Sequence, residues 1–222
     1  MATPPSPPAS PDGEAEPSKG PLLSLLAKGL ELWLRQQCQA VQHLEITLEG
    51  SMVQLLRGQL RGVGLRAQHV VFQNWSLERV ELRSDPIRVS LAGKPRGQAF
   101  QLEHPFMVRG SVLLTGDGLS RTLASPAGQE LADQLSEQLL GVTPLDSVKL
   151  LDERLILRAQ AQPGGDLVQV ETHLKLTEAG PMICPLDGRP PLPLPMDDAI
   201  RLQTAEVRAG VLELSGEALV RP

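Results

Sequence analysis

The chain has 222 residues, of which 41% are apolar, enough to form a sizeable core in one elongated domain or two small ones. It contains three Phe, two Trp and no Tyr, so it lacks material for aromatic nucleic-acid platforms, and we expect no nucleic-acid partner. The net charge is −5, and the two cysteines, Cys38 and Cys184, are too few for a disulfide framework.

Residues 1–20 are acidic and proline-rich. They hold too little apolar surface to offset the entropy of ordering, and we expect a disordered tail. They show neither the basic start nor the small-residue cleavage site of a secretory signal. We therefore expect the protein in the cytoplasm, and peripheral attachment to a membrane is left open. Residues 21–222 are expected to form a single domain.

Residues 22–41 are predicted to form a long helix with an unusually broad apolar face. On a wheel of about 100° per residue, Leu26, Leu30 and Trp33 belong to that face, whereas Lys28 and Arg35 belong to a narrow polar stripe. The charged residues come too early for a membrane-spanning helix of about 20 apolar residues. Because the rest of the chain is mostly predicted as strands, we expect a strongly curved sheet to wrap round this helix.

The segments after the helix alternate apolar and polar residues, which is typical of half-buried strands. Gly62 and Gly64 indicate bends or bulges of the kind that a wrapping sheet needs. A second, shorter helix is predicted between Ser125 and Gly141, because capping residues bracket a narrow leucine stripe there. The other expected elements are strands at 44–49, 52–57, 77–91 (bulged), 100–102, 106–114, 155–161 and 168–176, a basic turn at 93–97, a proline-rich loop at 181–195, and a final hairpin of 200–208 with 211–220.

The charge is distributed unevenly along the chain. Residues 51–121 carry ten Lys or Arg and five Asp or Glu, a net +5, whereas residues 1–50 carry −3 and residues 122–222 carry −7, which together give −5. This basic middle either pairs locally on a solvated strand face or meets an anionic membrane surface. In the second case, the candidate headgroup contacts are Arg88, Lys94 and Arg96.

Motifs for catalysis and metal binding are weak. Residues 62–67 match a relaxed dinucleotide-binding fingerprint, but a predicted strand continues through them where a helix should begin. The four histidines have no ligand-like spacing. The sequence places no nucleophile, base and orienting group together. We therefore expect no catalytic residue, no metal site, no cofactor and no enzymatic activity.

Residues 93–126 carry a more specific pattern. They contain a basic GKP turn, an HPF turn, the string VxGxVxLT and a Ser-Pro pair that opens a helix. This order resembles the LmeA-like phospholipid-binding family, bacterial proteins common in cyanobacteria and actinobacteria, and the likeness covers roughly residues 22–141. The resemblance implies a relation to tubular lipid-binding proteins, in which a curved antiparallel sheet wraps a long helix and leaves an apolar tunnel.

The expected fold is α+β, with a long N-terminal helix wrapped by a strongly curved antiparallel sheet and a second, shorter helix. The leading hypothesis is a peripheral lipid-binding protein that holds a phospholipid or another acyl lipid in an apolar groove between helix and sheet. Lipid transfer or maintenance of a membrane or envelope would be its wider role. The alternative is a non-enzymatic interaction or assembly scaffold with a filled core. The candidate groove residues are Leu26, Leu30, Trp33, Phe106, Val108, Val112, Val170 and Leu174.

Overall fold

The computed structural model describes residues 21–90, 101–160 and 164–222. Strands make up 52% of the described residues and helices 22%. The expected tail at residues 1–20 and the basic turn at residues 93–97 lie outside the described residues.

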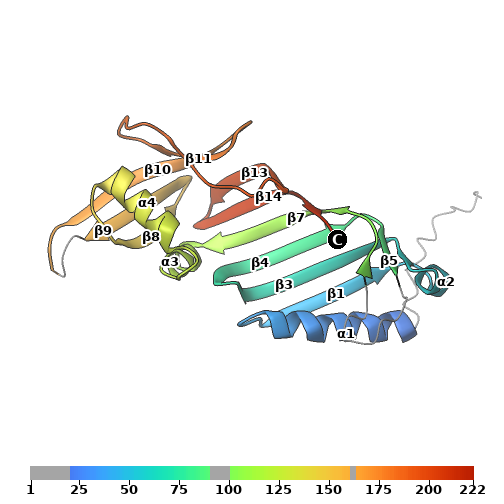
Figure 1. The fold of residues 1–222 in the computed structure, drawn as a ribbon. Coiled ribbons are helices and arrows are strands. Elements are labelled where there is room, and N and C mark those ends of the chain that lie inside the picture. Colours follow the sequence, from blue (N-terminus) through green and yellow to red (C-terminus); the bar gives the residue numbers. More distant parts are fainter. Residues whose placement is uncertain (1–20, 91–100, 161–163) are drawn as a thin grey trace, which may run out of the picture.

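The broadest element is an antiparallel sheet of six strands, called here the large sheet (Figure 1). Apolar and polar residues alternate along these strands, which suits a sheet with one packed face and one solvated face. The strands in spatial order are β1 (His43–Glu49), β3 (Gly62–Phe72), β4 (Trp75–Ser84), β7 (Phe106–Thr115), β14 (Val211–Val220) and β13 (Ile200–Arg208).

A second sheet has five antiparallel strands, in the order β12-β11-β10-β9-β8. Helix α4 (Gln129–Leu140) covers one of its faces, and the core between them includes Leu139, Leu157 and Ala159, each at most 1% exposed. The strands are β8 (Leu145–Leu151), β9 (Arg154–Gln160), β10 (Leu167–Thr177), β11 (Gly180–Pro185) and β12 (Leu192–Pro193).

The two sheets meet where β7 runs directly into α3 (Gly116–Leu123). Thr115 caps this helix by accepting a hydrogen bond from the Gly118 backbone N–H. A junction cluster of four buried residues joins the sheets, with one residue from β9 and three from the large sheet. These residues are Leu114, Leu155, Val207 and Leu212.

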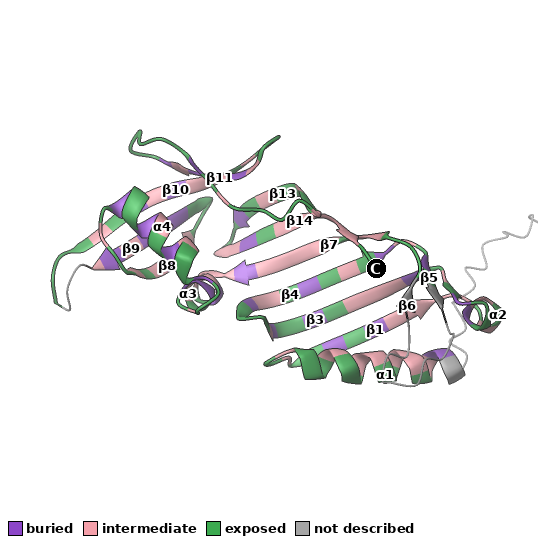
Figure 2. Cartoon of the chain, viewed as in Figure 1, coloured by how far each residue is buried: buried purple, intermediate pink, exposed green. Residues whose placement is uncertain are grey.

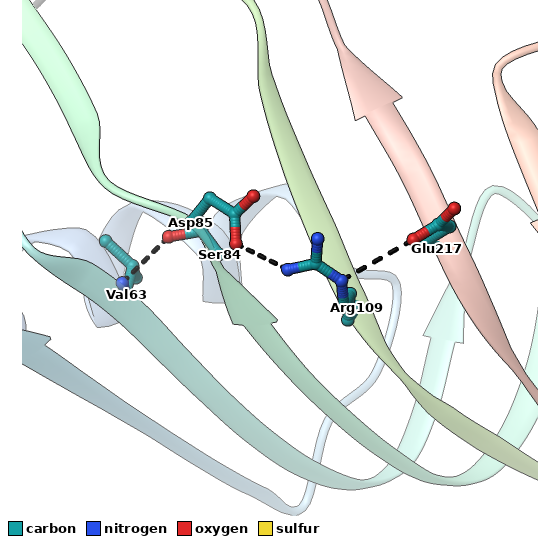
Figure 3. A network of polar contacts seen from close by, with 5 residues as sticks. All are labelled: Val63, Ser84, Asp85, Arg109 and Glu217. Atoms are coloured by element: carbon teal, nitrogen blue, oxygen red, sulfur yellow. Dashed lines mark hydrogen bonds and ion pairs between the residues drawn. The ribbon is translucent and has the colours of Figure 1, made fainter.

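The far end of the large sheet carries three short strands and a short helix. These are α2 (Met52–Leu56) and an antiparallel group of β2 (Gln59–Leu60), β5 (Ile87–Ser90) and β6 (Gln101–Leu102). The expected bulged strand at 77–91 is therefore two strands, because pairing of β4 with β7 stops at Ser84. The Ser84 hydroxyl instead accepts a hydrogen bond from the Val63 backbone N–H at 2.8 Å (Figure 3).

Helix α1 (Pro21–Gln37) packs chiefly against β1, along one side of the large sheet (Figure 1). Leucine and alanine favour the helix, and Pro21 suits its first turn. It has 17 residues and ends four residues before the expected end at residue 41. Residue 40 already bridges to Val71 of β3.

The expectation of a strongly curved sheet wrapped round a long helix is wrong. The edges of the large sheet, β1 and β13, stay apart with four strands between them, and α1 lies along the β1 side alone. Trp33, which the helical wheel placed on the apolar face, is 54% exposed, and the neighbouring Leu25 and Leu32 are 67% and 61% exposed. An apolar circumference indicates that a helix needs cover, but it does not show that the same chain supplies it.

Two further expectations are corrected. Residues 52–57 begin with a helix because Ser51 and Gln54 form a capping box. The proline-rich segment 181–195 contains β11 and β12, and β11 pairs with β10 while burying Pro181 and Ile183. Proline is tolerated there because β11 lies near the sheet edge, next to only a two-residue strand. The shorter helix is confirmed with its end at Gly141, but it begins at Gln129 after Gly128 and not at the expected Ser125-Pro126. The hairpins β9–β10 and β13–β14 are confirmed.

Candidate functional site

The large sheet has one face that is almost wholly apolar, called here the apolar sheet face. Strand register sets this face: Val80 lies opposite Val112, and Val112 lies opposite Leu214. Side chains alternate along each strand, so every second residue joins them on the same side. From β1 to β13 the face carries Leu44, Ile46, Leu48, Val63, Leu65, Ala67, Val80, Leu82, Val108, Val112, Leu114, Leu212, Leu214, Ala218, Val220, Leu202, Ala205 and Val207.

The opposite face is charged. Arg109 lies between Asp85 and Glu217, contacting the first at 2.5 Å and the second at 3.5 Å (Figure 3). The hydrogen bond to Asp85 is the main cause that raises the pKa of the Arg109 guanidinium. Arg83, directly across from Arg109, pairs with Glu49 at 2.8 Å. These exposed pairs place water on this side of the sheet, so the apolar sheet face is the side that needs cover.

Among residues 21–90, 101–160 and 164–222, protein covers the apolar sheet face only at its two ends. Near β1, Leu34 of α1 packs on a cluster that includes Leu44 and Val80. At the second sheet, the junction cluster buries Leu114 and Leu212. The stretch between these ends is half-buried in the described structure (Figure 2). This open stretch comprises Val108, Val112, Leu214, Ala218, Val220 and Leu202.

Two glycines lie in the middle of this open stretch. Gly110 and Gly216 are directly opposite each other on the adjacent strands β7 and β14. A Cβ at Gly110 would lie 2.0 Å from the Glu81 backbone oxygen, and one at Gly216 would lie 2.3 Å from the Arg201 backbone oxygen. Neither position tolerates a side chain in this backbone, and the Leu82 side chain lies over Gly110, with its Cδ2 atom 2.8 Å from where that Cβ would be.

A small cavity of about 220 Å³ lies between α1 and β1. Its lining mixes polar and apolar side chains, namely Leu23, Ser24, Ala27, Lys28 and Glu31 of α1 and Glu45, Ile46, Thr47 and Leu48 of β1. This volume is below the roughly 300–1,000 Å³ of typical ligand sites. The space between helix and sheet is therefore small for a phospholipid.

A larger cleft, of about 560 Å³, lies between the second sheet and β13. Its two arginines already have partners: Arg154 pairs with Glu171 and Arg208 with Glu206, both at 2.6 Å. Sequence reasoning missed this cleft because its walls come from four separate segments, residues 153–154, 173–174, 186 and 205–208. Its lining residues are Glu153, Arg154, His173, Leu174, Leu186, Ala205, Glu206, Val207 and Arg208.

The structure brings most of the predicted groove residues to one side of the large sheet. Leu26 and Leu30 are half-buried on α1, and Trp33 is 54% exposed. Val108 and Val112 lie on the open stretch of β7, where Phe106 is also half-buried on the same side.

The other predicted site residues lie elsewhere. Val170 is 3% exposed within the core of the second sheet, and Leu174 packs between that core and the junction cluster. Arg88 is exposed on β5, at the far end of the large sheet. Lys94 and Arg96 lie outside the described residues.

Groups suited to catalysis or metal binding are sparse in the described parts of the chain. No cluster of three or more His, Cys, Asp or Glu side chains could hold a metal ion among residues 21–90, 101–160 and 164–222. Burial raises the pKa of the Cys38 thiol, which packs beside Leu34 and Val41 and is less nucleophilic as a result. Within the same ranges, no helix has both the length and the hydropathy needed to cross a membrane.

A half-buried apolar sheet face beside an apolar helix suits a ligand with hydrocarbon chains. Comparison with protein families also indicates lipid binding. The family model for LmeA-like phospholipid-binding proteins matches residues 19–218, nearly the whole chain. The chain belongs to the LmeA-like phospholipid-binding family. Neither the search of curated proteins nor that of solved structures returned a match. Family membership supports lipid binding in general, with a phospholipid as the partner class.

Proposed function

We propose that this protein binds the acyl chains of a phospholipid on the open stretch of the apolar sheet face, beside α1. The observation that carries the proposal is the continuous apolar surface of six strands, which the described part of the chain covers only at its two ends. Contiguous apolar patches on a protein surface often mark binding sites, because monomeric soluble proteins rarely leave large ones exposed to water.

The energetics favour an elongated apolar ligand. Each methylene group removed from water contributes about 0.8 kcal/mol, so even partial cover of a long acyl chain yields several kcal/mol. A scaffold with a filled core, the alternative from the sequence, is less well supported because this face stays half-exposed.

Lipid carried by the purified protein tests the proposal directly. Native mass spectrometry should show adducts with phospholipid masses, and solvent extraction should recover the same lipids. Protein stripped of lipid should take phospholipid up again from phosphatidylcholine vesicles. A stripped, folded protein that takes up none would overturn the proposal.

Val108→Gln should lower phospholipid uptake about fivefold or more, because it places an amide on the open stretch where an acyl chain would lie. The matched control is Met107→Gln, on the next residue of β7, which is also half-buried but points to the charged face. Lipid bound per protein, measured after incubation with vesicles, checks both variants. Equal losses of phospholipid uptake in the two variants would show that lipid does not prefer the apolar sheet face to the charged face.

Arg88→Glu should lower the share of anionic phospholipid among the bound lipids without changing the total amount. Arg88 is exposed at the α2 end of the large sheet, where it can meet a headgroup phosphate. High salt should reduce the same preference, because attraction between exposed charges fades beyond a Debye length of about 8 Å. An unchanged lipid composition in the variant would remove Arg88 from the site.

A further inference from the structure

Exposed aromatic side chains gather at one end of the apolar sheet face. The chain has only five Phe and Trp residues in all. Among the four that lie in the described residues, three are exposed: Trp33 of α1 at 54%, Trp75 of β4 at 45% and Phe72 of β3 at 39%. Phe72 and Trp75 face each other across the β3–β4 turn. We call these three residues the aromatic end.

The β3–β4 hairpin continues the part of the apolar sheet face that α1 covers. His69, with φ 49°, interrupts the alternation after Ala67, and Val70 packs in the same cluster as Ala67. Val70 and Leu77 pair with each other and pack in the core beneath the end of α1. Phe72 and Trp75 lie two residues further along the same strands, so they continue that face into solvent. The turn between them has two residues with positive φ, which matches the twist of a tight hairpin.

The hairpin is held in place from both sides. Beyond the end of β7, α3 takes over the edge of β4, and the buried Thr122 hydroxyl accepts a hydrogen bond from the Ser76 backbone N–H at 3.0 Å. The same hydroxyl donates to the Gly118 backbone oxygen at 2.9 Å. On the other side, the Gln39 backbone N–H donates to Val71 at 2.8 Å, which ties the segment after α1 to the hairpin.

The charge at the aromatic end suits a lipid surface. Residues 32–43 and 66–77, which carry the aromatic end, contain Arg35 and Arg66 but no Asp or Glu, in a chain of net charge −5. The aromatic end therefore presents no unpaired carboxylate from these stretches to lipid headgroups.

The carboxylates that flank these stretches already have partners. Glu31 pairs with Arg35 and Glu78 with His69, both at 3.1 Å.

We infer that the aromatic end docks on the headgroup region of a lipid bilayer and opens the apolar sheet face toward it. Trp has an apolar body and a polar N–H, and it is enriched where hydrocarbon meets headgroups. A fixed hairpin that presents Phe72 and Trp75 gives up little conformational entropy on insertion. The inference rests on the proposed function, since it names the route by which lipid reaches that same face.

Tryptophan fluorescence reports on the aromatic end alone, because Trp33 and Trp75 are the only tryptophans in the chain. Adding phosphatidylcholine vesicles to the full-length protein should shift the emission to shorter wavelength, and brominated phosphatidylcholine should quench it. Emission that stays unchanged while the protein co-sediments with the vesicles would overturn the inference.

The double variant Phe72→Ser/Trp75→Ser should weaken binding to these vesicles about tenfold or more, measured by flotation. The matched control is Leu56→Ser, which removes a side chain that is 72% exposed on α2, at the opposite end of the large sheet (Figure 1). Equal weakening in both variants would contradict docking through the aromatic end.

The two proposals fail separately. If the double variant keeps its bound phospholipid after purification but exchanges it with vesicles more slowly, docking and lipid storage are both supported. If wild type holds phospholipid but binds vesicles no better than the double variant, docking is refuted and the proposed function stands. Concentration-dependent dimerisation that the double variant abolishes, without vesicle binding by wild type, would assign the aromatic end to a second copy and refute docking.

Discussion

Gly110→Ala should lower the free energy of unfolding by about 3 kcal/mol or more. The added methyl group would lie 2.0 Å from the Glu81 backbone oxygen and 2.8 Å from Leu82 Cδ2, so β4 and β7 would have to separate. Gly216 lies directly across from Gly110 and is just as crowded, so no neighbouring strand has space to absorb the shift. Urea denaturation followed by circular dichroism measures the loss.

Gly64→Ala is the control for this prediction. It lies in β3 of the same sheet, and its added methyl group would meet Thr47 Cβ at 3.7 Å, an ordinary contact. It should change the free energy of unfolding by less than about 1 kcal/mol. If the two variants lose the same stability, the close approach at Gly110 is not what requires glycine there.

Local patterns in the sequence predicted most of the strands. Residues 44–49 alternate strictly and form β1, and the hairpins β9–β10 and β13–β14 form where alternation surrounds a turn. The shorter helix was also found, since Gly141 adopts the left-handed conformation that its place after the helix predicts. These elements depend on neighbours close in sequence, which is why a single chain suffices to find them.

The arrangement of these elements was not predictable in the same way. The apolar circumference of residues 22–41 indicated a need for cover, but only long-range pairing decides that the six strands stay open and leave Leu25 and Trp33 exposed. One local signal was overlooked: Ser51 and Gln54 have the spacing of a capping box, which marks a helix start.

The candidate site was only partly readable from the sequence. Val108 and Val112 were found by alternation, because every second residue of β7 shares a face. Val170 has the same alternating pattern but belongs to another sheet, and periodicity does not say which sheet a strand joins. Phe72 and Trp75 were missed because their turn, Gln73-Asn74, lacks the glycine that usually marks a tight hairpin.

Leu114→Ala should lower the free energy of unfolding by about 2–5 kcal/mol while keeping a single cooperative transition. Leu114 is 1% exposed and packs in the junction cluster with Leu155 of the second sheet and Leu212 of the large sheet. The cavity that the shorter side chain leaves therefore lowers the stability of both sheets together, as expected if residues 21–222 fold as one domain. The adjacent Leu113→Ala, on the half-buried opposite face of β7, should cost about 1 kcal/mol.

Two probes make the cooperativity visible. Both tryptophans belong to the large sheet and α1, so fluorescence follows that part alone, whereas far-ultraviolet circular dichroism follows both sheets. Because the junction cluster couples the sheets, the two urea curves of Leu114→Ala should coincide and shift together to lower urea. Curves that separate, with the fluorescence midpoint apart from the dichroism midpoint, would instead show that the second sheet folds as an independent unit.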